Sequence, residues 1–474
     1  MSVINKLVAV LPEVKSPSQK YLPFKTKIKW TLIILLAYFI LGIIPLYGLG
    51  ANALKNLDLL AVILGAQFGT ILSLGIGPLV TSSIVLQLLT GSGILKIDVT
   101  TPEGRALFQG MQKIFSIFFV IFEAMIYVFM GGLSPAPGFS TWILVVQLCV
   151  GGFLVLLMDE VTSKWGIGSG ISLFIAAGVS LQIFIGALSP LSEAAATAKD
   201  LPLSQKLGFP FSNQPSVGRI WVLIKALLEG SINTALKAAS SILATIVVFV
   251  LAVYLQAMKV EVPLSFGKVR GYGVRWPLKF TYTSNIPVIL IAAFLANIQL
   301  LARLLEGKGH PFLGTFSGNL PTSGIVLWLQ GPDLLEILFT GGVNLLPSLA
   351  HASVYALFVV IGSVIFSIFW VQTSGMDAKS QAKQLMASGL QVSGFRRDER
   401  VLETLLSRYI MPLTVMGAIA VGFLAAVADL SGALSRGTGI LLTVMIIYKF
   451  YEDIAQQHMM DMHPALRKMM GGKQ

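Results

Sequence analysis

The stretch Gly69–Leu89 reads GTILSLGIGPLVTSSIVLQLL, and Gly75, Gly77 and Pro78 interrupt its apolar run. Proline removes a backbone N–H donor and glycine loosens a helix, so the run predicts a helix that is broken at this point. Inside a bilayer, such a break is tolerated only where protein or water satisfies the freed backbone groups. The stretch therefore predicts a broken membrane helix that borders a cavity or a pore.

The composition is that of a membrane protein. Of the 474 residues, 55% are hydrophobic and 12% are charged, whereas a soluble protein of this size carries about twice that charged fraction. Apolar runs of about 20 residues, the length that crosses a bilayer as a helix, recur along the chain. Cys149 is the single cysteine, so an intrachain disulfide is excluded. We therefore predict an all-α, polytopic membrane protein.

The apolar runs predict ten membrane spans. They lie at residues 30–48, 57–90, 107–130, 141–160, 169–188, 239–258, 281–302, 350–371, 409–428 and 436–455. A basic segment, Lys15–Lys29, precedes the first run, which is too long for the hydrophobic region of a signal peptide and lacks a small-residue cleavage site. We therefore expect residues 1–29 to form an N-terminal segment and the first run to be a retained helix.

The positive charges predict the orientation in the membrane. Two connectors rich in Lys and Arg, residues 259–280 and 372–408, are separated by two predicted spans and so face the same side. The positive-inside rule makes that side the cytoplasm. With ten spans, both termini are then cytoplasmic, including the tail at 456–474. The connectors 189–238 and 303–349 are expected on the outer face.

The chain divides into two halves with similar features, residues 30–188 and 239–455. The second span of the first half breaks at Gly-Ile-Gly-Pro, and the second span of the other half begins Thr283–Pro287 (TSNIP). The fifth spans open with Gly168–Ile175 (GSGISLFI) and Gly437–Val444 (GTGILLTV). An odd number of spans per half gives the halves opposite topology, and interrupted helices at matching positions point to a central site.

Five motifs resemble the SecY family, the large subunit of the protein-conducting channel, and follow the family's order over nearly the whole chain. They are Gly69–Leu89, Thr101–Gly110 (TPEGRALFQG), Gly166–Gly178 (GIGSGISLFIAAG), Tyr282–Leu290 (YTSNIPVIL) and Ser435–Val444 (SRGTGILLTV). The resemblance is closest to the archaeal proteins. It implies two five-helix halves around an hourglass pore, which translocates secretory proteins and releases membrane helices laterally into lipid. The expected location is the cell membrane of an archaeon, or the endoplasmic reticulum membrane if the source is eukaryotic.

The resemblance also implies a ring of apolar side chains at the waist of the pore. Transferred by motif, the ring consists of Ile76, Val80, Ile171, Ile175, Ile289 and Leu442. Ile and Val are bulky and stiff at χ1, so such a ring can close around a moving chain and exclude water by dewetting. Without the motifs, packing against lipid or protein would be the simpler interpretation of these side chains.

Residues 56–68 resemble the family's plug, a short helix that sits under the ring and moves aside. The candidate plug residues are Leu57, Leu60, Ala61, Leu64 and Gly65. The alternative interpretation is the first half of a continuous span, which the Gly/Pro break disfavours.

Glu123 is the clearest ionisable residue inside a predicted span. An intramembrane carboxylate is a functional candidate by default, because ionisation there is costly. The resemblance places it in a polar cluster at the lateral gate, where spans 2 and 3 meet span 7. Thr81 and Asn285 are its expected partners, with Gln87 nearby. A carboxyl group that only fixes helix packing is the plainer alternative.

The basic connectors have two interpretations. They determine the topology, and by resemblance they also insert at the exit tunnel of a translating ribosome, through Lys268, Arg270, Arg275, Arg396, Arg397 and Arg400. Lys and Arg suit this role because they neutralise RNA phosphates without reading a sequence. The resemblance further implies small membrane partners similar to SecE and Secβ, a nascent polypeptide with a signal sequence as substrate, and contact with membrane lipids.

Other classes of function fit the sequence less well. The four histidines form no HExxH motif, and neither a GxSxG motif nor a P-loop is present, so neither an enzyme nor a bound cofactor is expected. A secondary transporter of a small solute is the stronger alternative, because it also uses inverted repeats and broken helices. It would need several polar groups at its midplane, where this chain offers mostly Ile, Val and Leu with Glu123.

Overall fold

The computed structural model describes residues 12–18, 22–52, 54, 61, 64–95, 97, 101–192, 206–209, 214–266, 273–317, 320–339, 345–391, 398–435 and 437–462. Its helices are α2 (Phe24–Ile43), α4 (Gly77–Gly91), α5 (Pro102–Phe129), α6 (Thr141–Trp165), α7 (Gly170–Leu188), α10 (Arg219–Leu228), α11 (Ile232–Ala257), α12 (Ile286–Gly307), α13 (Ile325–Trp328), α14 (Leu334–Phe339), α15 (Leu345–Thr373), α16 (Ala378–Ala387), α17 (Glu399–Leu430) and α18 (Gly437–Met462). Its strands are β1 (Leu49–Asn52), β2 (Leu133–Pro135), β3 (Lys259–Phe266), β4 (Gly273–Lys279), β5 (Phe316–Ser317), β6 (Leu320–Pro321) and β7 (Leu390–Gln391).

The ten-span prediction is confirmed, because each predicted span corresponds to a helix in the described part of the chain. These helices are α2, α4, α5, α6, α7, α11, α12, α15, α17 and α18. Eight helical segments among the described residues are long and apolar enough to cross a bilayer by themselves. The broken span is helical only in its second part: α4 has 15 residues and begins at Gly77, with Pro78 in its first turn. A proline there costs no helical hydrogen bond.

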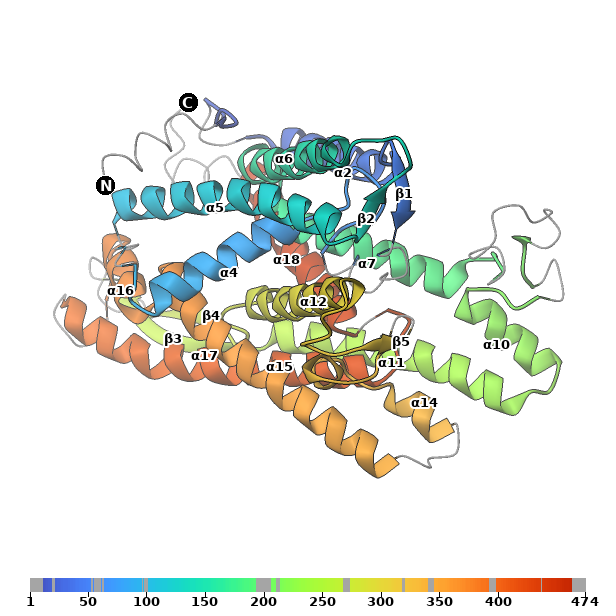
Figure 1. The fold of residues 1–474 in the computed structure, drawn as a ribbon. Coiled ribbons are helices and arrows are strands. Elements are labelled where there is room, and N and C mark those ends of the chain that lie inside the picture. The colour runs from blue at the N-terminus through green and yellow to red at the C-terminus, as the bar shows by residue number, and fades with distance from the viewer. Residues whose placement is uncertain are drawn as a thin grey trace.

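The long helices run roughly parallel and form a layered bundle (Figure 1). In this view α5 and α6 lie on one side, α15 and α17 on the other, and α4, α7, α12 and α18 between them. Helix α4 contacts α12, and α7 contacts α18. Because α4 and α7 belong to the N-terminal half and α12 and α18 to the C-terminal half, the two halves meet along these four helices.

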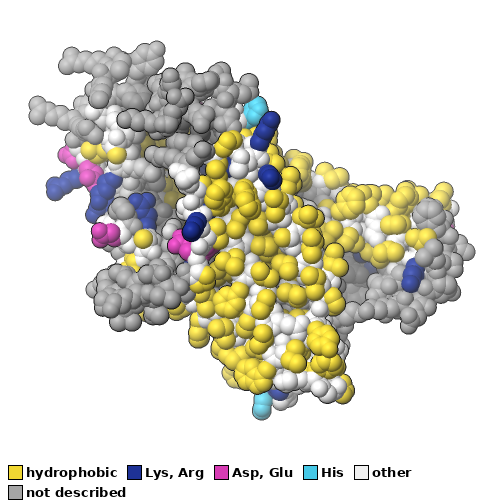
Figure 2. Space-filling view, turned by 90° about the horizontal axis from the view of Figure 1, so that it is seen from above, with side chains coloured by type: hydrophobic (Ala, Val, Ile, Leu, Met, Phe, Trp, Pro, Cys, Tyr) yellow, Lys and Arg dark blue, Asp and Glu magenta, His cyan; other side chains and the backbone are white. Residues whose placement is uncertain are grey.

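The short helices and the largest sheet lie at the two ends of the bundle. The three-stranded sheet β4-β3-β7 and α16 occupy one end, and α10 and α14 the opposite one (Figure 1). Figure 2 shows that the middle of one face is almost entirely apolar, with charged side chains gathered mainly toward one end. Large apolar side chains of other long helices are also exposed, such as Leu243 of α11 at 62% and Leu357 of α15 at 60%. A belt of this kind is what a bilayer covers.

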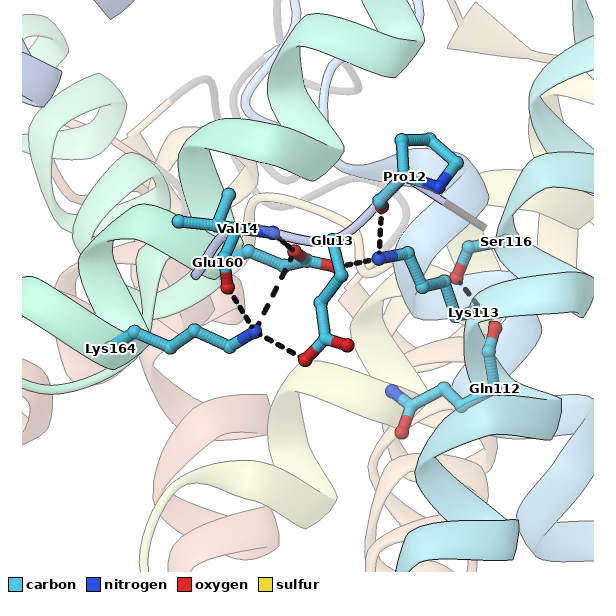
Figure 3. A network of polar contacts seen from close by, with 8 residues as sticks. All are labelled: Pro12, Glu13, Val14, Gln112, Lys113, Ser116, Glu160 and Lys164. Carbon is cyan, nitrogen blue, oxygen red and sulfur yellow. Dashed lines mark hydrogen bonds and ion pairs between the residues drawn. The ribbon is translucent and has the colours of Figure 1, made fainter. Parts of the chain in front are cut away.

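An N-terminal strap, residues 12–15, lies across α5 and α6 (Figure 3). Glu160 Oε2 accepts a hydrogen bond from the backbone N–H of Val14 at 3.0 Å, and Lys164 Nζ donates to the Val14 carbonyl at 2.6 Å. Lys113 of α5 pairs with Glu160 of α6. The same carboxylate therefore joins the two helices and fixes the strap to them.

Candidate functional site

The six ring residues come together at the centre of the bundle. They lie in one apolar cluster and come from α4 and its N-cap (Ile76, Val80), α7 (Ile171, Ile175), α12 (Ile289) and α18 (Leu442). All except the half-buried Ile171 are at most 7% exposed. The cluster therefore spans the interface between the two halves, as a ring closed by both of them requires.

The break in Gly69–Leu89 brings the end of the plug segment against the ring. Gly75 has a φ of +53°, and a Cβ at this position would stand 2.2 Å from the carbonyl oxygen of Leu64. Only glycine permits that backbone conformation and that approach. The next residue, Ile76, donates its backbone N–H to the same Leu64 carbonyl at 2.7 Å. The broken helix thus holds Leu64, which is fully buried, directly beside a ring residue.

Three of the five candidate plug residues are described, namely Ala61, Leu64 and Gly65, while Leu57 and Leu60 lie outside the described residues. A Cβ on Gly65 would stand 3.7 Å from Cγ2 of Ile76. The described end of the plug segment is therefore in contact range of the ring.

Two cavities lie on opposite sides of the ring. One, of about 470 Å³, is lined by the ring residues Val80, Ile171 and Ile289 and by polar side chains that include Arg105 and Lys449. The other, of about 320 Å³, is lined by the end of the plug segment and by α7 at Gly178, Leu181 and Gln182. Along α7 the first cavity, the ring and the second cavity follow one another on successive turns. The ring is the apolar partition between them.

Thr81 links three helices through one polar cluster. Its hydroxyl donates to Oε1 of Glu123 at 3.0 Å, and Asn297 Nδ2 donates to the Thr81 oxygen at 3.0 Å. These residues belong to α4, α5 and α12. Glu123 is 9% exposed, and among the described residues its Oε2 has no hydrogen-bond partner. The expected pairing of Glu123 with Thr81 is present.

The expected pairing of Glu123 with Asn285 is wrong. Asn285 is the N-cap of α12 and precedes Asn297 by three turns, which is about 18 Å along a helix. Its side chain accepts a hydrogen bond from Ser284 at 3.2 Å and lines the 470 Å³ cavity together with Gln87. The sequence signal for Asn297 was available, because it is an amide within an apolar span, the same criterion that selects Glu123.

Two aspartates hold the starts of the ring helices α7 and α18. Asp159 of α6 accepts the backbone N–H of Ile171 at 3.0 Å. Asp429 of α17 accepts the backbone N–H of Thr438 at 2.8 Å, and the Thr438 hydroxyl also donates to it. In each half, the fourth span thereby caps the fifth. The signal that sequence reasoning missed is an acid near the end of the span before each Gly-rich opening.

The basic connectors meet in one sheet. Strand β3, from the first connector, pairs with β7 from the second. Arg275 on β4 is exposed and pairs with Glu261 at 3.0 Å, and Arg400 is exposed in the first turn of α17. The remaining loop candidates, Lys268, Arg270, Arg396 and Arg397, lie outside the described residues.

Comparison with known proteins gives one consistent family. The SecY family model matches residues 70–451. The protein translocase subunit SecY of Methanothermobacter thermautotrophicus is 43% identical, over 98% of this chain and 98% of that protein. A structure described as that of a protein-conducting channel has a TM-score of 0.80 at 39% identity, covering 98% of this chain and 99% of that one. Sec61 in the canine ribosome–channel complex has a TM-score of 0.76 at 39% identity, with the same coverage.

Proposed function

The chain belongs to the SecY family, and we propose that its apolar ring is the seal of the channel through which polypeptides cross the membrane. The chain is a multi-pass membrane protein and the channel subunit of a protein translocase. The observation that carries the proposal is the ring itself, which lies between two cavities and across the interface of the halves. Its Ile, Val and Leu side chains offer no hydrogen bonds to a solute, which favours a polypeptide channel over a solute transporter.

The segment 56–68 acts as the plug of this channel. The position of Leu64 against Ile76 supports this role, because a backbone hydrogen bond between these two residues joins the described end of the segment to the ring. Such a contact can break without disturbing the helices around it. Displacement of the segment would open a path from one cavity to the other.

The lateral gate lies where α4 and α5 meet α12. The cluster of Thr81, Glu123 and Asn297 supports this position, since it is a hydrogen-bonded contact between helices of the two halves. Polar groups of this kind hold a gate shut in an apolar surrounding, and an apolar signal helix can replace the contact with its own packing. Asn285 and Gln87 line the 470 Å³ cavity beside the gate.

The end that carries the β4-β3-β7 sheet faces the cytoplasm, and both termini lie on that side. The positive charge of the two connectors supports this orientation. The sheet presents the connectors to a translating ribosome, whose pushing gives the channel its direction. Small membrane subunits similar to SecE and Secβ complete the complex, in the cell membrane of an archaeon.

The test is site-specific crosslinking to a stalled secretory chain. Single photo-reactive residues are placed at Ile76, Ile175, Ile289 and Leu442, with Leu243 on the exposed face of α11 as the control. We expect crosslinks at the four ring positions, their loss when the signal sequence is deleted, and none at the control. A folded, membrane-inserted protein without crosslinks at the ring positions would overturn the assignment.

A further inference from the structure

Tyr38 of α2 holds the end of the plug segment by a buried hydrogen bond. Its hydroxyl donates to the carbonyl oxygen of Gly65 at 2.9 Å, and the side chain is 2% exposed. The preceding carbonyl, of Leu64, accepts the backbone N–H of Ile76. Two consecutive carbonyls at the end of the segment are therefore satisfied by two different parts of the channel wall.

The aromatic side chain of Tyr38 is held in place by Phe174. It stacks on Phe174 of α7, with centroids 4.8 Å apart and an interplanar angle of 11°. Phe174 directly precedes the ring residue Ile175, and its side chain is fully buried. The Tyr38 hydroxyl therefore has a fixed position relative to the apolar ring of the pore.

The environment of this contact makes it reversible. Tyr38, Gly65 and Gln182 line the 320 Å³ cavity on the plug side of the ring. When the segment moves, both the hydroxyl and the Gly65 carbonyl face a space large enough for water and bordered by polar groups. Neither group is then left buried without a partner, so the bond can break at the net cost of an ordinary hydrogen bond.

We propose that the Tyr38 hydroxyl is a latch that holds the plug segment closed in the absence of a translocating chain. Tyr38 is a positioning residue, which acts on the ring through the segment at Leu64 and Gly65. The inference rests on the proposed role of residues 56–68 as the plug. It adds to that role the atom that keeps the segment in place.

The test measures ion-conducting openings of the purified channel complex in planar bilayers without any nascent chain. Tyr38→Phe removes the hydroxyl and keeps the ring that stacks on Phe174. We expect the ratio of open to closed channels to rise by between about twofold and tenfold, the loss of one neutral hydrogen bond. The matched control is Tyr127→Phe, because Tyr127 is equally buried and its hydroxyl has no hydrogen-bond partner among the described residues. We expect this control to behave as the wild type.

Deletion of residues 57–65 separates failure of the latch from failure of the plug. We expect the deletion to raise conductance further, and Tyr38→Phe to add nothing in the deleted background, because the bond has lost its acceptor. If the deletion raises conductance but Tyr38→Phe does not, the plug stands and the latch is wrong. An equal effect of Tyr38→Phe with and without the segment, or of Tyr127→Phe, also overturns the latch. No change in the deletion variant would overturn the plug itself.

Discussion

At the scale of single residues, Asp159 and Asp429 cap the starts of corresponding helices in the two halves. Each side chain accepts a backbone N–H at the start of a ring helix, where helical N–H groups have no partner within the helix. A carboxylate suits that position, because its charge also interacts favourably with the positive end of the helix. These hydrogen bonds set where α7 and α18 begin, and so where Ile171 and Leu442 stand.

Loss of one such cap is expected to lower stability. Asp429→Ala leaves the N–H and hydroxyl of Thr438 without their acceptor, which costs about 1–3 kcal/mol. The measurement is thermal unfolding of the purified complex. Asp398→Ala, which removes an exposed cap from Arg400 N–H on α17, is the matched control and should cost less. Equal losses would mean that the half-buried position of Asp429 adds nothing to the stability that its hydrogen bonds give.

The gate cluster gives a prediction about signal selectivity. Glu123→Gln keeps an acceptor for the Thr81 hydroxyl and should preserve export, whereas Glu123→Leu removes it and weakens the contact between the halves. Asn297→Leu should act in the same direction, because it removes the other hydrogen-bond partner of Thr81. Export is measured for signal sequences of graded hydrophobicity. Unchanged selectivity in both Leu variants would argue against a gate at this cluster.

At the scale of elements, the Gly-Ile-Gly-Pro break does two tasks. It ends the irregular stretch at Gly75, where the backbone closely approaches the Leu64 carbonyl, and it starts α4 at Gly77. The first task needs the absence of a Cβ, and the second needs a proline in the first helical turn. Both are properties of a few neighbouring residues.

Gly75→Ala is therefore expected to displace the plug segment. The new Cβ would stand 2.2 Å from the Leu64 carbonyl, so conductance without a substrate should rise. The control is Gly93→Ala, because Gly93 also has a positive φ, of +78°, but has open space around its Cβ position. That variant bears only backbone strain of about 1–2 kcal/mol. A closed channel in Gly75→Ala would contradict the close packing of the segment.

The N-terminal strap is expected to detach when its carboxylate anchor is lost. Glu160→Gln removes the charge that pairs with Lys113 and leaves only a neutral amide oxygen to accept the Val14 N–H, so hydrogen exchange at residues 12–18 should accelerate. Glu13 provides a weaker attachment: a hydrogen bond from Lys164 lowers the pKa of its carboxyl. That contribution is present at neutral pH and disappears as the pH falls through the lowered value. Slow exchange in the Glu160→Gln variant would show that the hydrogen bond from Lys164 Nζ to the Val14 carbonyl suffices to hold the strap.

At the scale of the whole molecule, the two basic connectors form one surface because β3 pairs with β7. Residues more than a hundred positions apart in the chain are thereby brought together. Charge on such a surface binds RNA through phosphates, so the affinity depends steeply on salt.

Charge reversal at Arg275 and Arg400, the two candidate arginines that the structure describes, tests this surface. The double variant Arg275→Glu and Arg400→Glu should weaken ribosome binding. It should also lower the dependence of log K on log salt by about 1 for each RNA phosphate that is no longer neutralised. Arg219→Glu, an exposed arginine on α10 at the opposite end, is the control and should leave binding unchanged. Binding is measured by cosedimentation with ribosomes at several salt concentrations. An equal loss in the control would point to net charge rather than to this surface.

The ten membrane-spanning helices and the break at Gly75–Pro78 could be predicted from the chain alone, because run length and Gly/Pro chemistry act locally, and the motifs predicted the ring residues. Which polar groups meet became known from the folded structure: Asn297 rather than Asn285 at Thr81, Asp159 and Asp429 at the ring helices, and Tyr38 at Gly65. Each residue advances a helix by about 1.5 Å and turns it by about a quarter of a circle. Contacts between helices therefore depend on axial position and rotation, which packing of the complete bundle sets.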